Sequence, residues 1–295
     1  MYSDGYKSNK EMRGEGQMKH CFLRFPDFKL KALTLSYDDG VIFDKKLIEI
    51  MSKYALKGTF NINSGLFALD EGGRCLTQNE AVALYAQSDN EVAVHGVKHL
   101  PLTEVNSAQA LGEVLLDRQN LEKIFHKLVH GMAYAYGGYN DSVVEMVRMC
   151  GINYARTVDD SEGFSLPTDW LRWKPTCHHR NPKLMDLAQA FLEESEGGYW
   201  RKSPKLFYLW GHSYEFEDRN EWHIIENFAK FIGNREDVWY ATNGEIYDYV
   251  QAFRNLQFSA EGAFVYNPSV LDVYICYIGK NYCIPAGKMV DLGTL

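Results

Sequence analysis

The chain has little positive charge and no long apolar run, and both shortages exclude a class of protein. Its 295 residues carry 31 Lys and Arg against 39 Asp and Glu, and its longest basic run is the Lys45-Lys46 pair. A protein that binds nucleic acid by neutralising phosphates needs a basic face, so we expect no nucleic-acid partner. No stretch reaches the roughly 18 consecutive apolar residues of a membrane-spanning helix, so we expect no membrane insertion. Hydrophobic residues make up 46% of the chain, too many for a disordered protein.

Cysteines and secretory features are also scarce. The six cysteines include no Cys-x-x-Cys pair, and six in 295 residues is far below the density of a disulfide scaffold. We therefore expect reduced thiols. The first 20 residues are polar and contain no apolar segment of the kind found in secretory signals. Together these features predict a cytoplasmic protein.

The apolar pattern alternates between strand-like and helix-like segments from Lys29 to Asn255. Strands are predicted at 31–37, 58–63, 91–95, 131–136, 154–157, 170–174, 206–210 and 238–241, and helices at 44–56, 77–87, 107–129, 141–150, 182–193, 221–232 and 245–255. This alternation is typical of βαβ units around a parallel, closed sheet. We predict a disordered or extended tail over residues 1–28, a (β/α) barrel over 29–256, and a small antiparallel β appendage without a helix over 257–295.

Reactive side chains follow several of the predicted strands, and in α/β folds chemistry gathers at the carboxyl ends of strands. Asp38-Asp39-Gly40 follows the first strand. The glycine allows a turn that brings both carboxylates to one centre, where one can bind a divalent metal and the other act as a general base. The alternative is a turn with an aspartate that caps a helix.

Three histidines stand at similar places. His95 and His99 are four residues apart, a spacing that puts two imidazoles on one face of a helical turn and around one ion. Two histidines and one carboxylate leave metal positions open for water and substrate. His212 ends an apolar strand and can donate a proton to a leaving group near neutral pH. The alternative for His95 and His99 is a coincidental pair on the surface. The alternative for His212 is a histidine with a structural role.

These motifs, in this order, resemble the polysaccharide deacetylase family of carbohydrate esterases. The matching segments are Thr34 to Gly40, His95 to His99, Met132 to Gly138 and Leu209 to His212, so the resemblance covers about residues 30–255. It implies a distorted (β/α) barrel of the polysaccharide deacetylase type. It also implies metal-dependent hydrolysis of an N- or O-acyl group on a sugar.

The resemblance assigns roles to individual residues. Asp39, His95 and His99 would hold one divalent ion, with Zn²⁺ as the first expectation and Co²⁺, Ni²⁺ or Mn²⁺ as alternatives. Asp38 would deprotonate a metal-bound water, and the backbone N–H of Tyr136 would share the oxyanion with the metal. His212 would protonate the leaving group. The substrate would be a carbohydrate or a related amide.

The chain departs from the family pattern in its third motif. The family arginine that orients the base carboxylate is replaced by Ala133, and Arg156, Arg172 and Lys174 are the candidate substitutes. Asp169-Trp170 matches loosely a family pair in which the Trp walls the pocket and the Asp tunes the acid histidine. Cys177-His178-His179-Arg180 is interpreted as a polar loop that can contact substrate, and not as a second metal site.

Aromatic residues beside the motifs are candidates for stacking on a sugar. The predicted substrate-binding residues are Tyr37, Tyr134, Trp170, Trp173, Arg172 and Tyr214. Besides an acyl hydrolase of carbohydrates, two functions stay open at this point. One is an amidohydrolase of a small cyclic amide, and the other is a non-catalytic carbohydrate-binding protein, which Ala133 favours.

Overall fold

The computed structural model describes residues 20–68, 73–193 and 203–293. Within these residues, no helix is both long and apolar enough to cross a membrane. The six cysteines are all free thiols.

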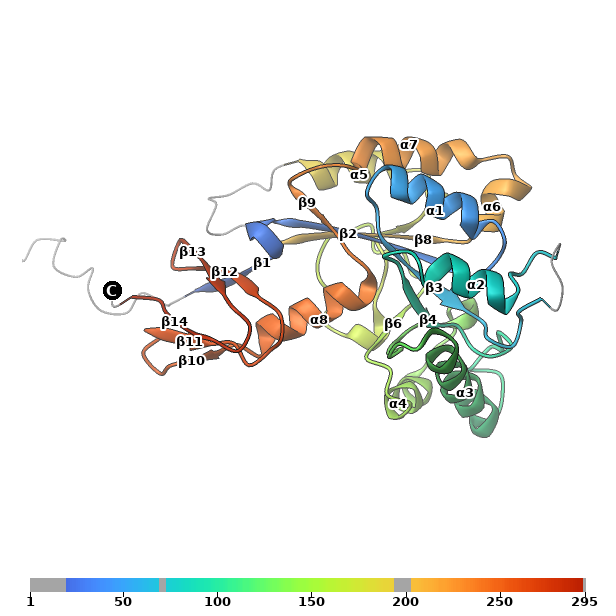
Figure 1. The fold of residues 1–295 in the computed structure, drawn as a ribbon, viewed down its shortest axis with the longest axis horizontal. Coiled ribbons are helices and arrows are strands. Elements are labelled where there is room, and N and C mark those ends of the chain that lie inside the picture. Colours follow the sequence, from blue (N-terminus) through green and yellow to red (C-terminus); the bar gives the residue numbers. More distant parts are fainter. Residues whose placement is uncertain (1–19, 69–72, 194–202, 294–295) are drawn as a thin grey trace, which may run out of the picture.

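An eight-stranded parallel sheet forms the centre of the protein (Figure 1). Its order is β6-β5-β4-β3-β2-β8-β7, and β9 also pairs with β2. The strands are β2 (Lys31–Asp38), β3 (Gly58–Ile62), β4 (Glu91–Val94), β5 (Gly131–Ala133), β6 (Tyr154–Arg156), β7 (Cys177–His178), β8 (Lys205–Gly211) and β9 (Val238–Tyr240). Central β2 is buried at seven of its eight residues, as expected for a parallel strand covered on both faces.

Helices cover both faces of this curled sheet (Figure 1). On one side lie α1 (Asp44–Lys53), α5 (Leu184–Leu192), α6 (Ser213–Asp218) and α7 (Trp222–Ile232). The others are α2 (Gln78–Tyr85), α3 (Ser107–Phe125), α4 (Asp141–Met149) and α8 (Asn243–Arg254). One large apolar core joins the strands to most of the helices. The arrangement is a distorted (β/α) barrel, so the predicted architecture is confirmed.

One predicted strand is wrong. Residues 170–174 form the 3₁₀ helix η4 (Trp170–Arg172) with an isolated bridge from Trp173 to Arg156. The Asp169 side chain accepts a hydrogen bond from the backbone N–H of Leu171 and so caps a helical turn. The side chains of Trp170 and Trp173 are both buried in one apolar cluster, whereas in a strand they would point to opposite faces. The short strand β7 follows and takes the place beside β8.

A small β appendage lies at one end of the barrel (Figure 1). One of its antiparallel sheets contains β10 (Gln257–Phe258), β11 (Phe264–Tyr266) and β14 (Met289–Asp291). The other contains β12 (Val273–Tyr277) and β13 (Lys280–Ile284), together with β1 (Cys21–Arg24), which is followed by the 3₁₀ helix η2 (Pro26–Phe28). The antiparallel appendage is thus as predicted, and it also receives a strand from the segment predicted as a tail. Residues 1–19 of that segment lie outside the described residues.

Candidate functional site

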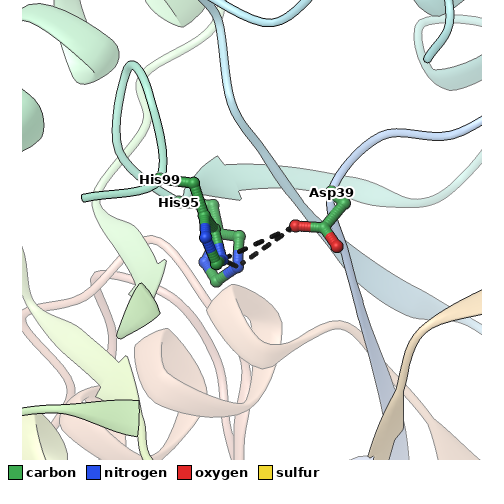
Figure 2. Close-up of side chains that lie close together, drawn as sticks. All are labelled: Asp39, His95 and His99. Atoms are coloured by element: carbon green, nitrogen blue, oxygen red, sulfur yellow. Dashed lines mark hydrogen bonds and ion pairs between the residues drawn. The ribbon is translucent and has the colours of Figure 1, made fainter. Parts of the chain in front are cut away.

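The turn after β2 places the two adjacent aspartates in different surroundings on the same side of the sheet edge. Asp38 is the last residue of the strand and is buried, whereas Asp39 and Gly40 adopt positive φ angles of 81° and 65°. This left-handed turn directs the Asp39 carboxylate toward the two imidazoles of the loop after β4 (Figure 2). The sequence expectation that a turn brings both carboxylates to one centre agrees with this geometry.

The loop that carries His95 and His99 is not the expected helical turn. It is an irregular loop in which His99 has a φ of 58°. The backbone N–H groups of His95 and Gly96 both donate to Asp117 Oδ2 at 3.0 Å. The N–H of Lys98 donates to Glu113 Oε2 at 2.8 Å. Two buried carboxylates of α3 therefore fix the loop, a role that the sequence pattern did not reveal.

The three expected ligands come together. The distances are 3.6 Å from Asp39 Oδ1 to His95 Nε2, 3.7 Å from Asp39 Oδ1 to His99 Nε2, and 3.0 Å between the two Nε2 atoms. Metal–ligand bonds of about 2.0–2.1 Å at tetrahedral angles put ligand atoms roughly 3.3 Å apart, so the triangle has the right size for one ion.

The orientation of His95 also fits a metal ligand. Its Nδ1 lies 2.9 Å from the carbonyl oxygen of Ala133, which can only accept a hydrogen bond. The proton therefore belongs on Nδ1, and the Nε2 lone pair faces Asp39 and His99. Metal-bound histidines are usually oriented in this way by a carbonyl or carboxylate behind them.

Asp38 pairs with Arg156, which projects from the end of β6. A guanidinium Nη2–H of Arg156 donates to Asp38 Oδ2, and the guanidinium lies 4.4 Å from the centre of the Trp210 ring. Both charged groups are buried. Burial alone would raise the pKa of Asp38, but Arg156, His95 and His212 lower it to about 2. Asp38 is therefore ionised at neutral pH, as a general base must be.

Of the three proposed substitutes for the missing arginine, only Arg156 contacts Asp38 in the described residues. Arg172 pairs with Asp169 and Asp141, and Lys174 lies 3.6 Å from Asp159. The positive charge that the family takes from the strand β5 is thus supplied here from the neighbouring strand β6.

His212 lies between two carboxylates. Its Nε2 is 3.8 Å from Asp38 Oδ2, and its Nδ1 is 3.7 Å from Oε2 of Glu215 on α6. Burial lowers the pKa of His212, but Glu215 and the two aspartates outweigh it, and the net shift is upward. Asp169, which the family pattern placed in this role, instead caps η4 and pairs with Arg172. Glu215 was not predicted, although its position three residues after His212 on a short helix was a usable signal.

His178 and His179 surround the same glutamate. The Nε2 atoms of both rings lie 3.1 Å from Glu215 Oε2. His178 Nδ1 accepts a hydrogen bond from the backbone N–H of Arg180, so its Nε2 carries the proton and donates toward the carboxylate. Burial opposes ionisation of Glu215, but the three imidazoles hold its pKa far below the usual value. The predicted polar loop is wrong for Cys177–His178, which form strand β7. His178, His179 and Glu215 are also close enough together to hold a metal ion, so the predicted absence of a second metal site stays a prediction.

Most of the aromatic residues predicted to bind substrate are buried instead. Tyr37 stacks on His179 in the core, and the Tyr134 hydroxyl donates to the carbonyl oxygen of Leu171. Trp170 and Trp173 pack edge to face, 4.8 Å apart, in the second apolar cluster. These four predictions are wrong because the rings complete the core behind the motifs. The Arg172 guanidinium is held by Asp169 and Asp141, and its predicted contact with substrate stays a prediction.

A cavity of about 460 Å³ lies above the metal ligands. Tyr214 lines it, with its ring 5.1 Å from that of His212, and its predicted contact with substrate stays a prediction. On the other side stands Tyr136, with a φ of 56° and its ring 4.4 Å from His99. The cavity is therefore flanked by two tyrosines and has Asp39 and His99 in its wall. Its size is that of a small-ligand site.

A sequence profile described as polysaccharide deacetylase matches residues 26–155. This part of the chain is therefore similar to the polysaccharide deacetylase family. The matched region contains Asp38, Asp39, His95 and His99 and ends before His212. The resemblance drawn from the motifs is thereby confirmed. No curated protein matches the chain.

Three solved structures resemble the chain at low sequence identity. A Mycobacterium smegmatis structure assigned as a polysaccharide deacetylase is 14% identical, with a TM-score of 0.54 over 79% of this chain and 94% of the other. The Streptococcus pyogenes deacetylase PplD, solved with acetate, is 22% identical, with a TM-score of 0.43 over 47% of this chain and 61% of the other. A family 4 carbohydrate esterase pseudoenzyme from Bacillus anthracis is 14% identical, with a TM-score of 0.45 over 77% and 68%. This chain thus spans about three fifths of the Streptococcus pyogenes protein, and the likeness to the Mycobacterium smegmatis structure concerns the fold alone.

Proposed function

We propose that the protein is a metal-dependent hydrolase that removes an acyl group, most simply acetyl, from a carbohydrate. The observation that carries the proposal is the convergence of Asp39, His95 and His99 beside a buried, ionised Asp38. A divalent ion held by the three ligands would polarise the acyl oxygen and make a water molecule more acidic. The donor set suits Zn²⁺, with Co²⁺, Ni²⁺ and Mn²⁺ as alternatives.

The residues of the chain account for the proton transfers. Asp38 is ionised and faces the same space as the ligands, so it can accept the proton of the attacking water. His212, whose pKa is raised by Glu215 and the two aspartates against the effect of burial, can give a proton to the leaving amine or alkoxide. The backbone N–H of Tyr136, at the rim beside His99, is proposed to stabilise the oxyanion.

Two observations support this proposal over the alternatives. Ala133 favoured a non-catalytic protein because it removes the arginine beside the base, but Arg156 supplies that charge. A small cyclic amide would favour a narrow, closed pocket, whereas Tyr136 at the rim is 71% exposed and the cavity opens beside it. An open site suits a sugar or an oligosaccharide.

The direct test is acetate release from acetylated sugars, including N-acetylchitooligosaccharides, by protein loaded with Zn²⁺ or Co²⁺. The Asp38→Asn variant should lose about 10²–10⁴-fold in kcat, the contribution typical of a general base. Release of acetate at the same rate by Asp38→Asn, or no release from any acetylated sugar, would overturn the proposal. Stoichiometric glycan binding without acetate release would favour the binding protein.

A further inference from the structure

The charged groups that line the cavity above the metal ligands are unevenly paired. Arg74 and Asp218 line it together, and Arg74 Nη2 lies 2.9 Å from both carboxylate oxygens of Asp218. The Arg74 guanidinium also stacks over the rings of Phe43 and Tyr214, at 5.4 and 5.5 Å. This pair is about half exposed and contributes no net charge.

Lys98 lines the same cavity without a partner. Its backbone N–H is held by Glu113, and its side chain is exposed. Within the described part of the chain, no hydrogen bond or ion pair engages its ammonium group. Among the described residues, the loop that carries His95 and His99 therefore also presents an unpaired cation beside the metal ligands.

The remaining charges leave the cavity positive once an ion is bound. Asp38 is balanced by Arg156, and Arg74 by Asp218. In the lining of the cavity, a divalent ion exceeds the charge of Asp39 by one and Lys98 adds another, whereas the carboxylates of Glu113 and Asp117 lie behind the histidine loop and offset part of this charge. The whole chain has a formal net charge of −8, so a positively charged cavity would be opposite in sign to the protein as a whole. A walled site of one sign concentrates ligands of the opposite sign.

We propose that the substrate is an acylated sugar that also carries an anionic group, a carboxylate or a phosphate, which binds Lys98. This inference rests on the proposed function and deepens it. The acyl group lies at Asp39, His95 and His99, and the sugar ring lies between Tyr136 and Tyr214. The anionic group then reaches Lys98, which directly precedes His99 in the loop. Lys98 is a specificity residue and takes no part in proton transfer.

The test compares kcat/KM for three N-acetyl sugars with the metal-loaded protein at low ionic strength. The substrates are N-acetylglucosamine, its 6-phosphate and its 3-O-carboxyalkyl ether, so that the two anionic arms distinguish phosphate from carboxylate. At least one anionic substrate should exceed the neutral one by about tenfold. Raising the salt concentration should reduce this ratio, because salt screens exposed charges. Lys98→Gln should lower the ratio by roughly three- to tenfold, and Lys98→Arg should retain it.

A matched control separates a local effect from one of net charge. Lys288→Gln removes the same charge from an exposed position between β13 and β14 of the appendage and should leave the ratio unchanged. Equal kcat/KM values for neutral and anionic sugars, or an unchanged ratio in Lys98→Gln, would overturn the inference.

Equilibrium binding of the same sugars by calorimetry keeps the two proposals apart. If no sugar releases acetate but an anionic sugar binds more tightly than N-acetylglucosamine and Lys98→Gln abolishes the difference, anion recognition holds and the proposed hydrolase fails. If acetate is released without any preference for charge, the hydrolase holds and anion recognition fails. If neither activity nor a preference in binding is found, both fail.

Discussion

Replacing Arg156 by alanine should impair both stability and the base. Arg156 and Asp38 are buried and paired, so the variant leaves the Asp38 carboxylate without its main cation. Removing one partner of a buried ion pair typically costs about 3–5 kcal/mol of unfolding free energy. At about 2 °C per kcal/mol for a chain of this size, Tm should fall by roughly 6–10 °C.

The same change should move the acid side of the pH–rate profile. In the wild type, Arg156 helps to lower the pKa of Asp38 to about 2 against the effect of burial. Without Arg156, burial dominates and the folded-state pKa rises, so the base becomes protonated at a higher pH. The acidic limb of kcat/KM should shift upward, and acetate release as a function of pH measures that shift.

Arg172→Ala is the matched control, since its guanidinium is held by the more exposed Asp169 and Asp141. It should leave the acidic limb in place and lower Tm by much less. If Arg156→Ala lost stability but kept the wild-type acidic limb, Arg156 would be structural only, and our explanation of the missing arginine at position 133 would be wrong.

Three further variants test other parts of the site and fold. Glu215→Gln removes a charge that raises the pKa of His212, so the folded-state pKa should fall and the alkaline limb of kcat should move to lower pH. An unmoved limb would contradict the assignment of His212 as the acid. Asp39→Asn should reduce bound Zn²⁺, measured by mass spectrometry of metals after dialysis, from about one equivalent to well below one, and full retention would place the ion elsewhere. Deleting residues 259–295 should lower Tm, because β1 loses its partner β12 and the Tyr249 hydroxyl loses the hydrogen bond donated by the backbone N–H of Tyr274. That hydrogen bond alone contributes about 1 kcal/mol. An unchanged Tm with altered substrate choice would give the appendage a functional role.

The sequence predicted most of the barrel because its strands and helices carry a clear apolar period. Buried β2 and amphipathic α7 begin and end within one residue of the predicted bounds. The strand prediction for residues 170–174 is wrong because Trp170 and Trp173 gave that segment a strand-like composition. In the structure, the Asp169 cap and the burial of both tryptophans in one cluster favour a helical turn. The short elements β7 and α6 have too few residues for a period to be visible.

The metal ligands could be predicted because each stands directly beside a motif, but their surroundings could not. Arg156 was one of three candidate substitutes for the arginine missing at position 133. Only the pairing of β5 with β6 in the folded sheet places it next to Asp38. Glu113 and Asp117 act on the histidine loop from α3, across the fold, and no local pattern marks them. The aromatic predictions erred because closeness to a motif in sequence does not distinguish the wall of the cavity from the core behind it, as the buried Tyr37 and Tyr134 show.

The central claim is that one divalent cation binds among Asp39, His95 and His99. Anomalous diffraction from crystals of the Zn²⁺-loaded protein, collected on both sides of the zinc edge, tests it most directly. We predict a single strong peak about 2.0–2.1 Å from Asp39 Oδ1 and from Nε2 of both histidines. A peak beside Glu215 instead, or no peak above background at the three ligands, would contradict the account.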